Sequence, residues 1–246
     1  MQIDLHVHSN VSFDSKIKIG LLLRDLKNIG LDGLALTDHD SLEAIPKAKE
    51  IAKKYDVKVF SAVEITTREG HIIAYGINEQ PPYRKSVGDI IDWIHDRDGI
   101  AVCAHPFRLT APSLGEKVYL QHFDALEINA RCVMSQNRAA ELAARLMNLP
   151  LIGGSDAHFT QNIGSISTFF YDELKDDDDL IHAIKHGNCE VRYRVPISYK
   201  AELIPAIPEE ELGLLDKFIE TKKEPILPII ETKGIKVQFI DRPSSK

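Results

Sequence analysis

Cysteine is scarce in this chain of 246 residues: it has only Cys103, Cys132 and Cys189, which lie far apart and are odd in number. No two of them form a CxxC pair, which argues against both a disulfide framework and a cysteine-based zinc site. The N-terminal segment MQIDLHVHS carries charge and histidine where a signal peptide needs a long apolar stretch. We therefore expect a protein of the reducing cytoplasm.

Long apolar runs and an excess of positive charge are missing as well. No apolar run approaches the roughly 20 residues that a membrane span needs, so no membrane association is expected. The formal net charge is −7, and no basic face is evident, which argues against binding of double-stranded DNA. A small phosphorylated substrate remains compatible with this charge, because a bound metal ion would invert the sign locally.

Short apolar runs alternate with segments of helical periodicity. Six runs predict strands, at residues 2–7, 33–37, 58–64, 100–104, 125–129 and 151–153. Helices are predicted over about 42–55, 87–94 and 139–147, and Asp40-x-x-Glu43 resembles a capping box for the first of them. This alternation indicates parallel strands with helices outside, in a barrel or an open doubly wound sheet.

One interval breaks the alternation. Only residues 65–70 separate Glu64 from the next apolar run, 71–77. A parallel crossover needs more residues than this, so the two strands are expected to form a hairpin. The hairpin would place His71, at the start of its second strand, beside Glu64 at the end of its first.

The composition changes near the C-terminus, where prolines become frequent around a charged, helix-like piece at 209–223. We expect residues 1–195 to form the barrel domain and residues 196–246 to be a C-terminal appendage. The appendage could be a swapped arm, a dimer contact or a tail. The sequence leaves its role and the oligomeric state open.

Histidines and carboxylates recur where a predicted strand gives way to a loop. Imidazole and carboxylate are the groups that Zn, Mn and Fe take as ligands, and nine of them exceed the needs of one ion. Their spacing therefore predicts a polynuclear metal centre. The candidate ligands are His6, His8, Asp14, His39, Glu64, His71, His105, Asp156 and His158.

Local sequence gives separate reasons for several of these residues. His6 and His8 are two apart on a strand, so both side chains project from the same face. Glu64 ends a mostly apolar strand, an awkward place for a carboxylate without a cation, and its two oxygens could bridge two ions. His105 precedes a proline, which predicts an extended backbone at that position.

Four further polar residues accompany the candidate ligands. Asp38 precedes His39 and could either cap a turn or orient a neighbouring imidazole. Arg108 and Arg131 follow strands that should end at the site, and guanidinium groups bind phosphate bidentately. Each arginine is thus a candidate for holding a substrate phosphate, with surface solvation or an ion pair as the alternative. Glu127 fits a structural role as well as a catalytic one.

The ordered segments HxH…D, TDHD, E…H, HP and GSDAH, spread over residues 1–192, resemble the PHP family, the polymerase and histidinol phosphatase domain. This resemblance implies a distorted (β/α)7 barrel of the α/β class, with three metal ions at the C-terminal ends of the strands. It implies His6, His8, Glu64 and Asp156 as ligands of one ion, Glu64, His71 and His105 of the second, and Asp14, His39 and His158 of the third.

The resemblance also implies hydrolysis of phosphate esters with three divalent ions, which could be Mn, Zn or Fe. The substrate expected is a nucleotide, such as a 3′,5′-bisphosphate, or the 5′ end of a short RNA. Catalytic roles are expected for Asp38, His39, Glu64 and Asp156. The alternatives are a histidinol-phosphate phosphatase and a non-catalytic PHP module that binds a polymerase or a ribonucleoprotein. The intact ligand set favours an enzyme.

Overall fold

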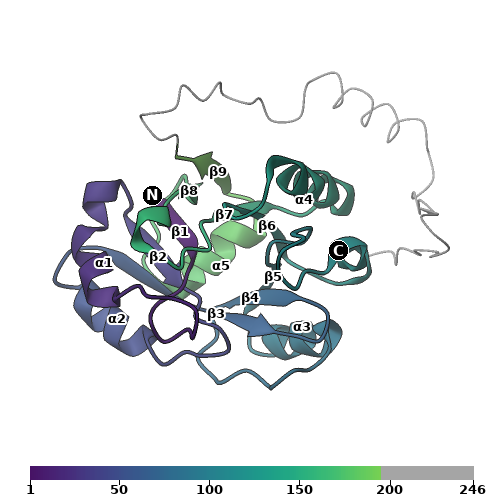
Figure 1. Ribbon diagram of the computed structural model, residues 1–246, viewed down its shortest axis with the longest axis horizontal. Helices are drawn as coiled ribbons and strands as arrows, with labels where there is room; N and C mark the ends of the chain where they lie inside the picture. Colours follow the sequence, from purple (N-terminus) through teal and green to yellow (C-terminus); the bar gives the residue numbers. More distant parts are fainter. Residues whose placement is uncertain (195–246) are drawn as a thin grey trace. The chain divides into compact units, whose positions relative to one another are not determined.

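The computed structural model describes residues 1–194, and the appendage predicted over 196–246 lies outside the described residues. Nine strands of the described part form one sheet, in the order β7-β6-β5-β4-β3-β2-β1-β8-β9 (Figure 1). The strands are β1 (Gln2–Val7), β2 (Gly33–Leu36), β3 (Lys58–Thr66), β4 (His71–Tyr75), β5 (Ile100–Cys103), β6 (Ala125–Asn129), β7 (Leu151–Gly154), β8 (Ile166–Phe170) and β9 (Cys189–Tyr193).

The sheet curls into a nearly closed, distorted barrel. Strands β1 to β3 run parallel to one another, as do β5 to β7, whereas β4 is antiparallel to both of its neighbours. A parallel bridge joins Val7 to Ala157, just past β7, and the Gly153 N–H donates to Thr168 Oγ1 of β8 at 2.8 Å. These contacts bring β7 round to β1 and β8. The predicted barrel is confirmed.

The predicted hairpin is confirmed as well. β3 and β4 pair antiparallel, with Glu64 opposite Ile73 and Thr66 opposite His71. Because β4 runs against its neighbours, its first residue lies at the same end of the barrel as the last residues of the parallel strands. The hairpin therefore delivers His71 to the edge where the other candidate ligands lie.

Five α-helices pack around the strands, and three short 3₁₀ helices lie in the loops of the described part. The predicted helices correspond to α2, α3 and α4, and α4 ends with Asn148 in the left-handed conformation, before Pro150. The helices are α1 (Ile19–Asp25), α2 (Ile45–Ala52), α3 (Val87–His95), α4 (Met134–Met147) and α5 (Asp177–Lys185), and the 3₁₀ helices are Lys27–Ile29, Gly115–Leu120 and Thr160–Asn162. None of the helices among residues 1–194 is long and apolar enough to cross a membrane.

The three larger clusters of the apolar core follow from the two faces of the sheet, and a small fourth cluster joins Ile128, Ala140 and Ile166. Inside the barrel, strand side chains such as Phe60 and Tyr75 pack against Leu180 and Ile184 of α5. Outside it, α1 and α2 cover β1 to β3, and α3 and α4 cover β4 to β6. Helix α5 thus closes one end of the barrel, at the first residues of the parallel strands. The opposite end is left for polar side chains.

Two local predictions were wrong. Helix α2 begins at Ile45, and Asp40 does not cap it, because the Asp40 carboxylate accepts the Thr66 N–H at 2.7 Å. His105 is not extended: its φ is 32°. Its N–H donates to Glu127 Oε2 at 2.8 Å, so this turn is fixed by a tertiary hydrogen bond that overrides the preference of a residue before proline.

Candidate metal centre

All nine candidate ligands lie at the end of the barrel opposite α5. Each comes from the last residues of a parallel strand, from the loop just after one, or from the start of the reversed strand β4. A pocket of about 480 Å³ opens above them, lined by Asp14, His39, Glu64, His71, His105, Asp156 and His158. His6 and His8 are fully buried beneath it.

Glu64 is the centre of this cluster. Its Oε1 lies 2.9 Å from His71 Nδ1 and 3.1 Å from His105 Nε2. Its Oε2 lies 3.2 Å from His8 Nε2, 3.2 Å from His39 Nδ1 and 3.3 Å from His6 Nε2. One buried carboxylate thus faces five imidazoles, and its two oxygens face different ones, as a carboxylate that bridges two ions would.

Two further carboxylates extend the cluster toward the pocket. Asp156 Oδ1 lies 3.4 Å from both His8 Nε2 and His158 Nδ1. Asp14 Oδ2 lies 2.9 Å from His158 Nε2 and 3.6 Å from His39 Nε2. Contacts shorter than 4 Å therefore link the ligand candidates into one network.

Within this network, three overlapping groups have ligand atoms that all lie within 4.8 Å of one another. They differ from the grouping that the resemblance implies. His8 also belongs to the group of Asp14, His39 and His158, and His39 also belongs to the group of Glu64 and His71, whereas His105 and Asp156 belong to none of the three groups. The groups are His6, His8 and Glu64; His39, Glu64 and His71; and His8, Asp14, His39 and His158.

The donor atoms fit metal ions. The Nε2 atoms of His6 and His8 lie only 3.1 Å apart, and they face Glu64 together. His39 Nδ1 is buried within ion-pair distance of Glu64 but makes no hydrogen bond. Buried polar atoms are normally hydrogen-bonded, so an orphaned nitrogen aimed into a cluster of ligand atoms is explained by a cation. Imidazole and carboxylate together suit divalent transition metals.

The electrostatics of the cluster lead to the same conclusion. Burial alone would lower the pKa of His6, but Glu127, Glu64 and Asp156 raise it well above its ordinary value. Burial alone would also lower the pKa of His8, yet Asp156 and Glu64 raise it to about 9. Conversely, His6 and His71 hold the pKa of Glu64 well below its usual range despite burial. The site demands positive charge, which metal ions supply as well as protons do.

Buried carboxylates outside the ligand set fix the histidines. Glu127 Oε1 lies 2.7 Å from His6 Nδ1, and a carboxylate only accepts, so Nδ1 carries the proton and Nε2 is free to bind a metal ion. Ser12 Oγ lies 3.1 Å from His8 Nδ1 and donates to Asp38 Oδ1 at 3.0 Å. Glu127 and Asp38 thus orient the two deepest imidazoles.

Asp38 itself faces away from the pocket. Its carboxylate accepts hydrogen bonds from the Ser9 N–H, the Ser9 hydroxyl and the Ser12 hydroxyl. With both oxygens occupied in this way, the geometry favours positioning of a neighbouring imidazole over the catalytic role expected from the sequence.

Comparison with known proteins supports this reading of the ligand pattern. A family model described as PHP-associated matches residues 134–189. A PolC-type DNA polymerase III of Bacillus subtilis is 36% identical over 76 residues, which are 30% of this chain and 5% of that protein. The barrel resembles the crystal structure of a Bifidobacterium adolescentis protein provisionally described as a metal-dependent phosphoesterase. That likeness has a TM-score of 0.57 at 16% identity and covers 76% of this chain and 96% of the other. The matched segments are similar to proteins of the PHP family.

Two other relatives extend the PHP comparison. An uncharacterised protein of Methanocaldococcus jannaschii is 29% identical over 138 residues, which are 52% of this chain and 81% of that protein. A phosphoribosyl 1,2-cyclic phosphate 1,2-diphosphodiesterase of Eggerthella lenta is 31% identical over 85 residues, which are 32% of each protein.

The backbone of this barrel is strained around its pocket. Seven non-glycine residues of the described part have positive φ, and four of these line the pocket: Asp40 at 50°, Arg84 at 45°, His105 at 32° and Asp156 at 51°. Side chains other than glycine adopt such angles at a cost in free energy, and they do so most often at functional sites. Here the strain orients two of the ligand candidates, His105 and Asp156.

The two predicted phosphate-binding arginines both line the pocket, but they differ in solvent exposure and in the contacts that they make. Arg108 is buried and pairs with Asp156 Oδ2 at 2.6 Å. The Arg131 side chain is 41% exposed, and its Nη1 lies 3.1 Å from His158 Nδ1 and 3.5 Å from Asp156 Oδ1. Arg131 is therefore the more available of the two for a substrate.

One supporting residue that the sequence did not single out is Asp4. Its buried carboxylate accepts the N–H groups of His6, Ser155 and Gly164 at 3.3, 3.0 and 2.8 Å, which ties β1 to the loop after β7. Burial raises the pKa of Asp4 to about 6. Apart from its charge in an apolar strand, nothing in the local sequence marks this role, because two of its partners lie more than 150 residues away.

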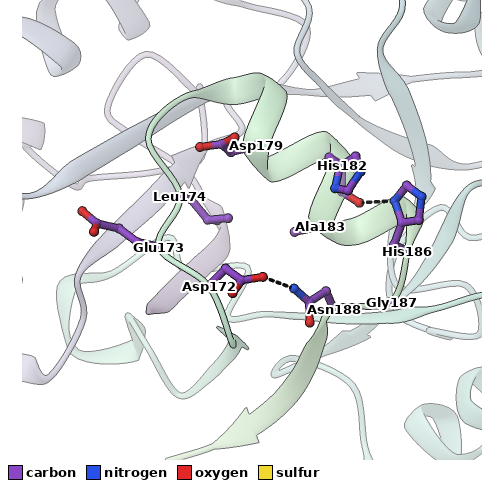
Figure 2. Close-up of a pocket in the computed structure, with 9 residues that line it drawn as sticks. All are labelled: Asp172, Glu173, Leu174, Asp179, His182, Ala183, His186, Gly187 and Asn188. Carbon is purple, nitrogen blue, oxygen red and sulfur yellow. Dashed lines mark hydrogen bonds between the residues drawn. The ribbon is translucent and has the colours of Figure 1, made fainter.

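The remaining histidines lie away from this centre. Figure 2 shows a second cavity, of about 420 Å³, with His182 on α5, His186 just after the end of α5, and Asp172 hydrogen-bonded to Asn188. The two imidazole rings stack at 4.0 Å, and His186 Nδ1 lies 2.8 Å from the carbonyl oxygen of His182. None of the nine candidate ligands lines this cavity, and no close metal-binding group found among residues 1–194 includes these histidines.

Proposed function

We propose that this protein is a phosphoesterase that depends on divalent metal ions, up to three of which bind among the nine ligand candidates. The observation that carries the proposal is the convergence of six imidazoles and three carboxylates at one end of the barrel, where five of the imidazoles face Glu64, with no ligand position replaced. Three divalent ions would outweigh the charge of Asp14, Glu64 and Asp156. The excess of positive charge suits a phosphate dianion.

When bound, the ions neutralise charge on phosphate oxygens and lower the pKa of water, so that a nucleophile is available at neutral pH. The protein supplies orientation. Glu64 faces His71 with one carboxylate oxygen and His6 with the other, and Glu127 fixes the tautomer of His6. Arg131, at the mouth, donates to phosphate oxygens that the ions do not reach. His39 and Asp156 line the pocket, which is compatible with the catalytic roles predicted for them.

For the substrate we propose a nucleotide with a second phosphate, such as a 3′,5′-bisphosphate, or the 5′ end of a short RNA. The pocket of about 480 Å³ is of the size that small ligands occupy. The exposed Arg131 beside the cluster provides a place for a phosphate other than the one cleaved. Histidinol phosphate, the enzymatic alternative, has a single phosphate and offers no second phosphate to this arginine.

A panel of phosphate esters tests the proposal. The full chain is purified, its metal content is measured, and it is assayed with Mn, Zn or Fe. The panel contains a nucleoside 3′,5′-bisphosphate, a 5′-phosphorylated short RNA, histidinol phosphate and an aryl phosphate. We expect about two to three equivalents of metal, and hydrolysis that a chelator abolishes.

His158→Ala, with His122→Ala as the matched control outside the site, shows whether the activity belongs to the cluster. Loss of hydrolysis in His158→Ala alone supports the proposal. Less than about half an equivalent of metal, with no hydrolysis of any ester when metal is added, would refute the enzyme. Capture of a polymerase or structured RNA by that inactive, metal-free protein would favour the non-catalytic module.

A further inference from the structure

Two aromatic side chains stand exposed at the mouth of the metal-centre pocket. Phe13, in the loop after β1, is 90% exposed, and Tyr83, in the loop between β4 and α3, is 75% exposed; both line the pocket. An exposed phenylalanine gains none of the free energy that burial of its ring would provide. Folding therefore does not account for an aromatic ring at this position.

The Phe13 ring is held beside the candidate metal ligands. It stacks on the His39 imidazole, with ring centroids 5.6 Å apart and planes inclined by 25°. The chain is anchored on both sides of it, because Ser12 Oγ accepts the His39 N–H at 3.0 Å and Asp14 lies 2.9 Å from His158. The ring thus lies beside His39 and leaves most of its surface exposed at the pocket mouth.

Tyr83 is held in a comparable way. The Arg84 guanidinium lies 5.3 Å from the centre of the Tyr83 ring, and Arg84 also lines the pocket. The backbone of Arg84 has a φ of 45°, and its carbonyl oxygen accepts a hydrogen bond from Arg68 Nε at 3.2 Å. This loop therefore presents a ring and a cation to the same pocket that Phe13 lines.

We propose that Phe13 and Tyr83 form a stacking site for a planar ring of the substrate, so that the substrates taken are nucleotides and are held by the nucleobase as well as by phosphate. The inference rests on the proposed function, which places the phosphate at the metal centre. Any of the nucleobases can stack on an aromatic side chain, because every base has a π face. A sugar phosphate or an alkyl phosphate offers no such face, and it gains nothing from these two rings.

Binding of two ligands that differ only in the base tests the stacking site. Adenosine 5′-monophosphate and ribose 5-phosphate are titrated calorimetrically into the Mn-loaded full chain. We expect the nucleotide to bind about 5- to 100-fold more tightly, the range that base stacking contributes. Phe13→Ala and Tyr83→Ala should each reduce this ratio, and Phe13→Leu, which keeps an apolar side chain without a π face, should reduce it too.

Tyr171→Ala is the matched control, since Tyr171 is exposed but lies outside the pocket. As an independent readout, 2-aminopurine riboside 5′-monophosphate should lose fluorescence on binding to wild type and regain it in Phe13→Ala. Equal affinities of wild type for the two ligands within about twofold, no measurable binding of the nucleotide, or a ratio that both alanine variants leave unchanged would overturn the stacking site.

The two proposals fail separately. A ratio that depends on Phe13, in a protein that hydrolyses no ester, would leave the stacking site standing without the proposed activity. Hydrolysis of esters with no preference for a base would support the proposed activity and overturn the stacking site.

Discussion

Replacing Glu127 by glutamine should weaken metal binding although Glu127 touches no metal ion in the proposed site. Its two oxygens accept from His6 Nδ1 at 2.7 Å, from the His105 N–H at 2.8 Å and from Asn129 Nδ2 at 3.0 Å. Glutamine keeps the volume but turns one acceptor into a donor. If the amide oxygen serves His105 and Asn129, the amide NH₂ faces His6 Nδ1 and drives its proton to Nε2, the atom that faces Glu64.

If the amide is turned the other way, the His105 N–H meets a donor and the strained turn at that residue loses its anchor. Either orientation therefore disturbs one ligand candidate, His6 in the first case and His105 in the second. Removal of a group that orients a ligand commonly costs 10–100-fold in metal affinity, which is about 1.4–2.8 kcal/mol.

The assay is competition for Zn against a fluorescent chelator, in wild type, Glu127→Gln and the exposed control Glu43→Gln. The control removes the same charge at a position where the side chain is exposed to solvent. We expect Glu43→Gln to match wild type. Equal Zn affinity in Glu127→Gln and wild type, with both proteins folded, would refute the argument that this carboxylate sets the tautomer of His6.

Two further substitutions probe the ligands and the substrate. Glu64→Gln should lower metal content more than Asp14→Asn or Asp156→Asn does, because Glu64 faces five imidazoles. Full metal content and near-normal turnover in Glu64→Gln would refute its assignment as a bridging ligand. Arg131→Ala should raise KM for a nucleoside 3′,5′-bisphosphate by a factor worth about 1.5–3 kcal/mol and leave an aryl phosphate nearly unaffected, with Arg145→Ala as control. Equal losses on both substrates would remove Arg131 from phosphate binding.

The sequence alone was enough to predict which side chains gather at this end of the barrel, because the signals that mark them are local. A ligand type at the end of an apolar run can be recognised without knowledge of the fold, and the parallel order of the strands then brings such ends to one edge. The spacing between Glu64 and His71 even predicted the hairpin that reverses β4. All nine candidates lie within one network as a result.

The supporting role of Glu127 could not be predicted in this way, because its partner is distant in the chain, whereas orientation of an imidazole by Asp38 was one of the two roles that the sequence left open. Glu127 resembles any carboxylate at a strand end until His6, 121 residues away, is placed against it. The same distance effect explains the two local errors. Asp40 would suit a capping box, but its carboxylate accepts the Thr66 N–H instead. His105 is not in the extended conformation, because Glu127 accepts its N–H.

The arginines show a further limit of prediction from sequence. Arg108 and Arg131 occupy equivalent positions after strands, and only the structure separates them. Arg108 is committed to Asp156 at 2.6 Å, so its removal would disturb a ligand candidate as well as any bound phosphate. Arg131 is partly exposed, and its loss is the cleaner probe of substrate binding.

The balance of buried charge gives a physical reason why the ligand set and its supports belong together. Among the described residues, five carboxylates are buried, namely Asp4, Asp38, Glu64, Glu127 and Asp156, whereas Arg108 is the one buried residue of lysine or arginine type. Buried charges are costly unless they are paired or bind a metal ion. Glu127 and Asp38 add to this negative charge while they direct imidazole nitrogens inward, so each support also increases the demand for cations. In the proposed enzyme, the divalent ions therefore offset a charge imbalance that the fold itself creates, and the same imbalance holds the site ready for them.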